Sequence, residues 1–193
     1  MIAKSIEAET SPNCTYWLDK DNRIIRVDNR WLAFAEENEG IDSCLPELVI
    51  NRPLWDFIHD QETRHLYEII IEKVRSRGKP LTIPFRCDSP SKRRYLELTI
   101  SVLPGGELEF QSTLLKVESR EPVELLREST PRSDEHVRIC SFCKKVALSK
   151  TEWVEVEEAV RRLGLFERTA LPQLTHGACP ACHRSIVADL LNL

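Results

Sequence analysis

The fold class is decided by residues 81–117, which read LTIPFRCDSPSKRRYLELTISVLPGGELEFQSTLLKV. Two turn signals divide this stretch, Asp88-Ser-Pro-Ser91 and Pro104-Gly105-Gly106. Residues 95–103 roughly alternate apolar and polar side chains, as a strand with one covered face does. We therefore predict three strands that fold back on one another as antiparallel hairpins, over residues 81–87, 95–103 and 107–117.

A long helix is predicted just before these strands, over residues 61–76. Its apolar side chains recur at helical spacing: Leu66, Ile69, Ile70 and Val74. Gly78 and Pro80 end it, since glycine favours the left-handed stop of a helix and proline cannot continue one.

Further upstream we predict two short strands, a helix after the N-cap Asn29, and a shorter element, over residues 16–18, 23–27, 30–37 and 53–58. The order of elements predicts an α+β fold, in which helices cover one face of an antiparallel five-stranded sheet.

This order resembles a PAS domain, and several short motifs carry the likeness. They are Trp17-Leu18-Asp19, Arg23-Ile24-Ile25, Val27-Asp28-Asn29-Arg30-Trp31 and Leu54-Trp55-Asp56-Phe57-Ile58. The resemblance covers residues 14–118 and departs from the family at Asn22, where PAS domains often have Gly. It implies a sensory or interaction domain that binds a protein partner, a second copy of itself, or a small-molecule ligand.

Two C-x-x-C pairs lie near the C-terminal end, Cys140-Ser-Phe-Cys143 and Cys179-Pro-Ala-Cys182. Each pair can supply two thiolates from one tight turn, and zinc prefers four thiolates in a tetrahedron. We therefore predict a structural Zn2+ held by Cys140, Cys143, Cys179 and Cys182. His176 or His183 could replace one cysteine, and His176 could instead hydrogen-bond a thiolate.

Residues 136–193 are predicted to form a small helical module around this metal, after a charged, proline-containing linker over residues 119–135. Helices are expected over residues 152–163, with a capping box from Ser149 to Glu152, and over residues 184–192. A segment with so few apolar positions needs a cross-link to fold, and the zinc is expected to provide it.

This module also resembles a short cysteine module that follows PAS or receiver domains in bacterial signalling proteins. The shared pattern is C-x-x-C-K-K, a tryptophan at a helix start, and H-G-x-C-P-x-C. The matching residues beside the four cysteines are Lys144, Lys145, Trp153, His176, Gly177 and Pro180. The resemblance implies a bacterial signalling context.

Three other uses of the cysteines are open. Each pair could act as a redox dithiol, Cys179-Pro-Ala-Cys182-His183 fits the attachment motif of c-type haem, and a zinc module could bind DNA in a transcription regulator. Haem is not expected, because its attachment needs export and the first residues carry no apolar signal segment. A redox pair explains two cysteines, whereas zinc explains all four.

Three further groups of side chains could carry chemistry. A cluster of acids and histidines could bind metal but is expected to cap and start the long helix: Asp56, His59, Asp60, Glu62 and His65. A charged group is expected to form a solvated hairpin tip, with an anion or partner contact as the alternative: Arg86, Asp88, Arg93 and Arg94. Four aromatic residues could line a ligand cavity but are expected to be core: Trp17, Trp31, Trp55 and Phe57.

Composition, charge and the motifs that are present disfavour several classes of function. The 193 residues are 41% hydrophobic and 30% charged with a net charge of −4, which is typical of a globular protein and does not favour nucleic-acid binding. No apolar run approaches the ~20 residues of a membrane span, so we expect a cytoplasmic protein whose seven cysteines are metal ligands or thiols. Without a P-loop or a G-x-S-x-G motif, it is expected to be a non-enzymatic signalling protein.

Overall fold

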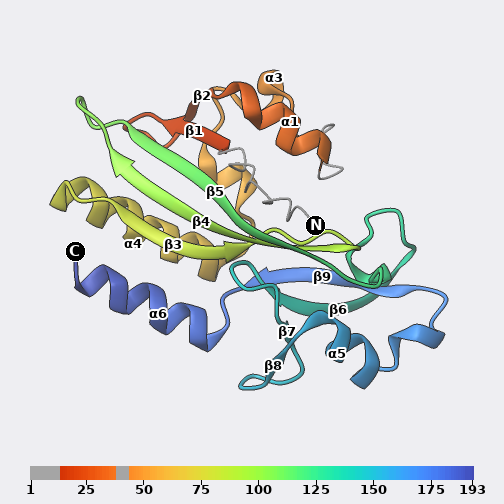
Figure 1. The fold of residues 1–193 in the computed structure, drawn as a ribbon. Coiled ribbons are helices and arrows are strands. Elements are labelled where there is room, and N and C mark those ends of the chain that lie inside the picture. Colours follow the sequence, from red (N-terminus) through yellow and green to blue (C-terminus); the bar gives the residue numbers. More distant parts are fainter. Residues whose placement is uncertain (1–13, 38–43) are drawn as a thin grey trace, which may run out of the picture.

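The computed structural model describes residues 14–37 and 44–193. Its first sheet has the strand order β2-β1-β5-β4-β3, and every neighbouring pair is antiparallel. The strands are β1 (Cys14–Leu18), β2 (Ile24–Val27), β3 (Leu81–Arg86), β4 (Lys92–Val102) and β5 (Leu108–Ser119). The predicted antiparallel sheet of five strands is confirmed within these residues, and its first and last strands lie side by side (Figure 1).

The alternation along β4 separates the two faces of this sheet. Leu96, Leu98 and Ile100 are buried on one face. On the other face the hydroxyls of Thr82 and Thr99 are exposed and lie 3.0 Å apart across β3 and β4. One face is therefore available to pack against helices, as the alternating pattern predicts.

The long helix α4 (Gln61–Arg77) packs on the apolar face through side chains that include Leu66, Ile70 and Val74. It begins after Asp60, whose carboxylate accepts a hydrogen bond from the amide of Thr63 at 2.7 Å. It ends at Gly78, whose φ of 67° is left-handed.

Three shorter helical segments are α1 (Asn29–Glu37), α3 (Pro46–Val49) and the 3-10 turn η1 (Leu54–Phe57). The predicted cap of the first of these is wrong by one residue. The carboxylate of Asp28 accepts hydrogen bonds from the amides of Arg30 and Trp31, and Asn29 is already helical.

A second sheet has the order β8-β7-β6-β9. Its strands are β6 (Arg132–Cys140), β7 (Val146–Ala147), β8 (Trp153–Val154) and β9 (Leu171–Gly177). The strands β6 and β9 are parallel, and the chain between them forms β7, β8, the helix α5 (Val156–Arg162) and the turn η3 (Leu165–Glu167). The chain ends in α6 (Pro180–Leu191), which lies beside α4 (Figure 1).

The prediction of a small helical module is therefore wrong, because this part also contains a four-stranded sheet. The two longer strands were missed because β6 consists largely of charged and polar residues and β9 contains Pro172, so their pairing and not their own propensity decides their conformation. The predicted capping box is also misplaced. The hydroxyl of Ser149 accepts from the amide of Glu152 at 3.1 Å, but this bond closes the turn between β7 and β8, and α5 starts only at Val156.

The two parts of the chain share a core. The cluster of buried side chains around Leu66 and Ile83 also contains Phe142, Ile186 and Leu190 from the second part. The segment predicted as a linker, residues 119–135, forms the turn η2 (Glu124–Leu126) and buries Leu125 in the core of the second sheet. The division into domains 14–118 and 136–193 stays a prediction, and the described contacts run across it. No helix of the described residues is long and apolar enough to cross a bilayer.

Candidate metal centre

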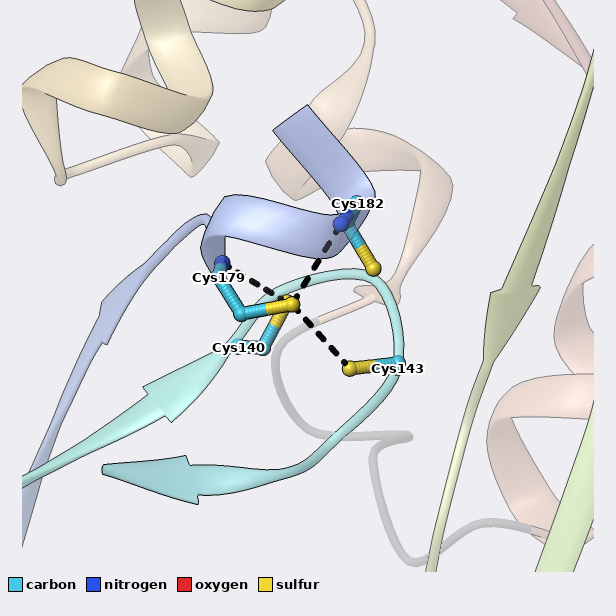
Figure 2. A group of neighbouring side chains, drawn as sticks. All are labelled: Cys140, Cys143, Cys179 and Cys182. Atoms are coloured by element: carbon cyan, nitrogen blue, oxygen red, sulfur yellow. Dashed lines mark hydrogen bonds between the residues drawn. The ribbon is translucent and has the colours of Figure 1, made fainter. Parts of the chain in front are cut away.

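The predicted ligands Cys140, Cys143, Cys179 and Cys182 come together in one group, with all four sulfur atoms within 4.8 Å of one another (Figure 2). The sulfurs of Cys143 and Cys179 are 3.7 Å apart. Four sulfurs placed tetrahedrally about 2.3 Å from zinc lie about 3.8 Å from each other. A disulfide needs about 2.05 Å, so this spacing fits a shared metal ion and not a disulfide bond.

The first pair sits on a tight turn that follows β6. The amide of Cys140 donates to the carbonyl of Lys145 at 2.8 Å, and the amide of Lys144 donates to the carbonyl of Cys140 at 3.1 Å. Lys144 closes the turn with a φ of 60°, a left-handed conformation that is uncommon outside glycine. These bonds hold both thiols of the pair on one side of the turn.

The second pair opens α6. Cys179 is its N-cap residue, and its sulfur accepts a hydrogen bond from the amide of Cys182 at 3.4 Å. Pro180 occupies the first helical position, where its missing N–H costs nothing. The amide of Cys179 donates to the sulfur of Cys140 at 3.3 Å, so the two turns are already joined by a hydrogen bond (Figure 2). The positive end of the α6 dipole favours thiolates at this place.

The four thiols perturb one another's ionisation. Hydrogen bonds from Cys143 and Cys182 hold the pKa of Cys140 far below its usual range. The bond to Cys140 raises the pKa of Cys143 to about 12, and the pKa of Cys182 also lies well above its ordinary value. The thiols share protons around the Cys140 sulfur. A site of four thiolates releases such protons when it binds a cation.

Comparison with models of known protein families and with curated proteins finds no match for this sequence. The site therefore rests on its geometry and on the chemistry of its side chains.

The first turn is packed into the core of the first sheet. The ring of Phe142 stacks on Tyr67 of α4 with a centroid distance of 6.1 Å, and its carbonyl accepts from the amide of Arg86 at 2.7 Å. Cys140 and Cys179 are buried, and Cys143 and Cys182 are half-buried. The cysteine turns consequently touch both β3 and α4.

A second set of contacts fixes the approach to Cys179. A Cβ atom on Gly177 would lie 2.3 Å from the guanidinium of Arg138, so any other residue there would displace that side chain from its present position. Arg138 pairs with Glu62 of α4 at 2.5 Å, which lowers the pKa of Glu62, and the same carboxylate accepts from the amide of Ala178 at 3.3 Å. Glu62 thereby ties the start of α4 to the second cysteine pair.

His176 and His183 are exposed, and neither belongs to the group of metal-ligand atoms. The five acids and histidines near α4 do not converge either, because in the described residues the four cysteines are the one group with that spacing. Asp60 caps the helix, as predicted. Asp56 pairs with Arg52, and the His65 ring lies 3.9 Å from Glu68.

The charged group near the β3–β4 turn is not a solvated tip, so that prediction is wrong. Arg86 pairs with Asp88, whose side chain is 1% exposed, and donates to Glu155 at 2.7 Å. Arg120 bridges Asp88 at 3.2 Å and Glu157 at 3.0 Å. Arg93 contacts Glu157 at 2.8 Å. These six residues, named here the arginine clasp, bind the end of the first sheet to the start of α5.

Sequence reasoning missed Arg120, Glu155 and Glu157 as members of this clasp. Arg120 lies in the segment expected to be a linker, and both glutamates lie where α5 begins, so each has an ordinary local explanation. Arg86 and Glu155 are 69 positions apart in the chain, and no local pattern signals such a pair.

The four aromatic residues do not line a common cavity. The indole of Trp17 donates to Glu109 at 3.0 Å, and Trp31 meets the ring of Tyr16 edge-on at 5.8 Å. Trp55 and Phe57 line two different surface hollows. Cys87 is half-buried just after β3, where burial raises the pKa of its thiol.

Proposed function

We propose that Cys140, Cys143, Cys179 and Cys182 hold one structural zinc ion in a non-enzymatic cytoplasmic signalling protein. In this protein a PAS-like sensory part is coupled to a zinc-held interaction module. The observation that carries the proposal is the convergence of two thiol pairs, with 35 residues between them in the sequence, so that all four sulfur atoms lie within 4.8 Å of one another. Zinc bound there supplies a cross-link between the end of β6 and the start of α6 and needs no redox chemistry.

The sensory assignment rests on the resemblance to PAS domains. Two strands, several helices, a long helix and three strands follow one another in the order on which that resemblance depends. Supporting it, the long helix packs on the apolar face of the antiparallel sheet through Leu66, Ile70 and Val74. A small-molecule ligand, a protein partner or a second copy of the chain would act by favouring one of two arrangements of this part.

Two sets of contacts support the proposed coupling between the two parts. One is the first cysteine turn, where Phe142 packs on α4 and hydrogen-bonds β3. The other is the arginine clasp, which joins the β3–β4 hairpin to α5. A shift of the sheet relative to α4 would change both, so a signal sensed in the first part would reach the second.

A thiol-redox role is the alternative that one observation favours. Cys179 and Cys182 open a helix directly after a strand, which is where active dithiols are found. Against it, Cys179 is 3% exposed, whereas a reactive thiol must be reached by its substrate. A single redox dithiol would also leave Cys140 and Cys143 without a role, although their thiols lie close to it.

Metal analysis of the purified full-length protein tests the proposal. We expect about one zinc per chain with four sulfur ligands by X-ray absorption, and no visible haem band. Replacing zinc with cobalt(II) should give the absorption of a tetrahedral thiolate complex. Metal below ~0.2 equivalents in protein purified without chelator, together with disulfide reductase activity, would favour the redox alternative.

A further inference from the structure

The first turns of α4 reach the chain beside three of the four cysteines. The first contact is made by Glu62, whose carboxylate accepts a hydrogen bond from the amide of Ala178 at 3.3 Å. Ala178 immediately precedes Cys179, whose own amide donates to the sulfur of Cys140. Arg138 of β6 pairs with the same carboxylate and holds it in place. Glu62 therefore supports the backbone where the second cysteine pair begins.

Two further contacts support the first cysteine turn. The hydroxyl of Thr63, a residue that is 4% exposed, donates to the hydroxyl of Ser141 at 2.8 Å. The ring of Tyr67 stacks on Phe142. Ser141 and Phe142 are the two residues between the cysteines of the first pair. Since Thr63 and Tyr67 are four positions apart, one face of the helix holds both residues of the turn.

These contacts differ from those on the exposed side of the same helix. There Arg64 pairs with Glu68, four positions further on, so the pair stays within α4. Glu62 and Thr63 instead bond to residues 116 and 78 positions away, and both of those residues adjoin a cysteine. The start of α4 is therefore built against the metal centre and not only against the sheet.

A metal centre responds to the groups that hold its ligands. Four sulfur atoms must stay in a tetrahedron about 2.3 Å from zinc. Loss of a group that orients a metal ligand typically weakens metal binding about 10–100-fold. Leu66 and Ile70 fix α4 in the core of the first sheet. A movement of α4 in that core would therefore displace the cysteine turns and change the spacing of the thiols.

We propose that Glu62, Thr63 and Tyr67 are positioning residues of the metal centre, through which the first part of the chain sets how tightly the four cysteines hold zinc. The inference rests on the proposed zinc site and adds its regulation by α4. Coupling between two sites is reciprocal, so zinc uptake favours the tight-binding position of α4 by the same factor by which that position favours zinc.

The zinc Kd of full-length variants, measured by competition with a chelator of known affinity, tests this. Thr63→Val keeps the shape of the side chain and removes its hydroxyl, so the Kd should rise about tenfold. Thr63→Ser keeps the hydroxyl and should stay within about threefold of the wild type. Glu72→Gln, on the exposed side of α4, should bind zinc as the wild type does.

Glu62→Ala separates positioning from electrostatics. A zinc ion with four thiolates carries a net negative charge, so removal of a nearby carboxylate should tighten zinc binding if charge alone matters. Positioning predicts the opposite, a Kd raised about tenfold, because the amide of Ala178 loses its acceptor.

The absorption spectrum of cobalt(II) bound in place of zinc distinguishes positioning from a general loss of stability. Thr63→Val and Glu62→Ala should shift or weaken the visible bands of the tetrahedral centre. Val49→Ala removes buried methyl groups from α3, so it should lower stability but leave the cobalt spectrum and the zinc Kd unchanged.

Three results would overturn the positioning role. They are a wild-type Kd and cobalt spectrum in Thr63→Val, tighter zinc binding by Glu62→Ala, and a Kd that rises equally in Val49→Ala. Each of them leaves the metal centre itself intact. Wild-type protein that binds no zinc contradicts the metal centre, so the failure of one proposal is distinguishable from the failure of the other.

Discussion

The two sheets of this protein differ in the length of their strands and in what is expected to stabilise them. In the first, β4 and β5 are 11 and 12 residues long, and α4 covers their apolar face. In the second, β7 and β8 are two residues each, and the fold closes at four cysteines. The first sheet is stabilised by burial of its own large apolar face. The second sheet has a smaller core, so it should depend more on a cross-link and on the core that it shares with the first.

The strongest test of this comparison is to remove one of the four proposed metal ligands. Cys179→Ser should lower the free energy of unfolding by at least about 4 kcal/mol, because structural zinc contributes on the order of 10–16 kcal/mol in peptides. Hydrogen exchange should show β6 and β9 losing protection first. Because Phe142 and Ile186 belong to the core shared with α4, part of that loss should extend to β3 and α4.

Cys87→Ser is the matched control for this experiment, since it removes a thiol outside the metal group. It should keep its zinc and its protected β6 and β9. A chelated protein that retains cooperative unfolding of the second sheet would contradict the structural role of the metal.

The arginine clasp offers the next largest effect. Asp88→Asn removes a carboxylate that is 1% exposed and leaves the buried cations Arg86 and Arg120 short of a partner. Breaking a buried ion pair from one side costs about 3–5 kcal/mol. Urea unfolding should show a loss of about 3 kcal/mol for this variant.

The exposed pair of Glu158 and Arg161 supplies the comparison for Asp88→Asn. Glu158→Gln should change stability by less than about 0.5 kcal/mol, because exposed ion pairs contribute little. Equal effects of the two substitutions would mean that the clasp is as hydrated as an ordinary surface pair.

Acid should produce the smallest effect. Burial raises the pKa of Glu157, but Arg93 and Arg120 outweigh it and hold that pKa below the usual value. A depressed carboxyl pKa stabilises the folded state above the unfolded value, about 4.3, and this contribution is lost as the pH falls through the folded pKa. Stability of Glu157→Gln should therefore fall less steeply than that of the wild type below about pH 4.5. If stability falls equally with pH in the wild type and in Glu157→Gln, Glu157 does not contribute to the pH dependence of the clasp.

Local patterns in the sequence predicted what local physics decides. Each of three local patterns predicted the element in which it lies. They are the alternation of β4, the spacing of Leu66, Ile70 and Val74 in α4, and the end of α4 at Gly78. The two C-x-x-C pairs predicted their own convergence, because one shared metal ion would use all four thiols together.

The tertiary structure alone decided which distant elements meet. The parallel pairing of β6 with β9 is one case, because neither strand has a strong propensity and each depends on the other. The arginine clasp is another. The residue type alone does not show whether a charged side chain is buried or an aromatic ring is exposed. Chain segments far away in the sequence decide the surroundings of each side chain. The sequence thus determined the elements of the first sheet and the four cysteines of the candidate metal centre, and long-range packing determined the second sheet and how the two sheets are joined.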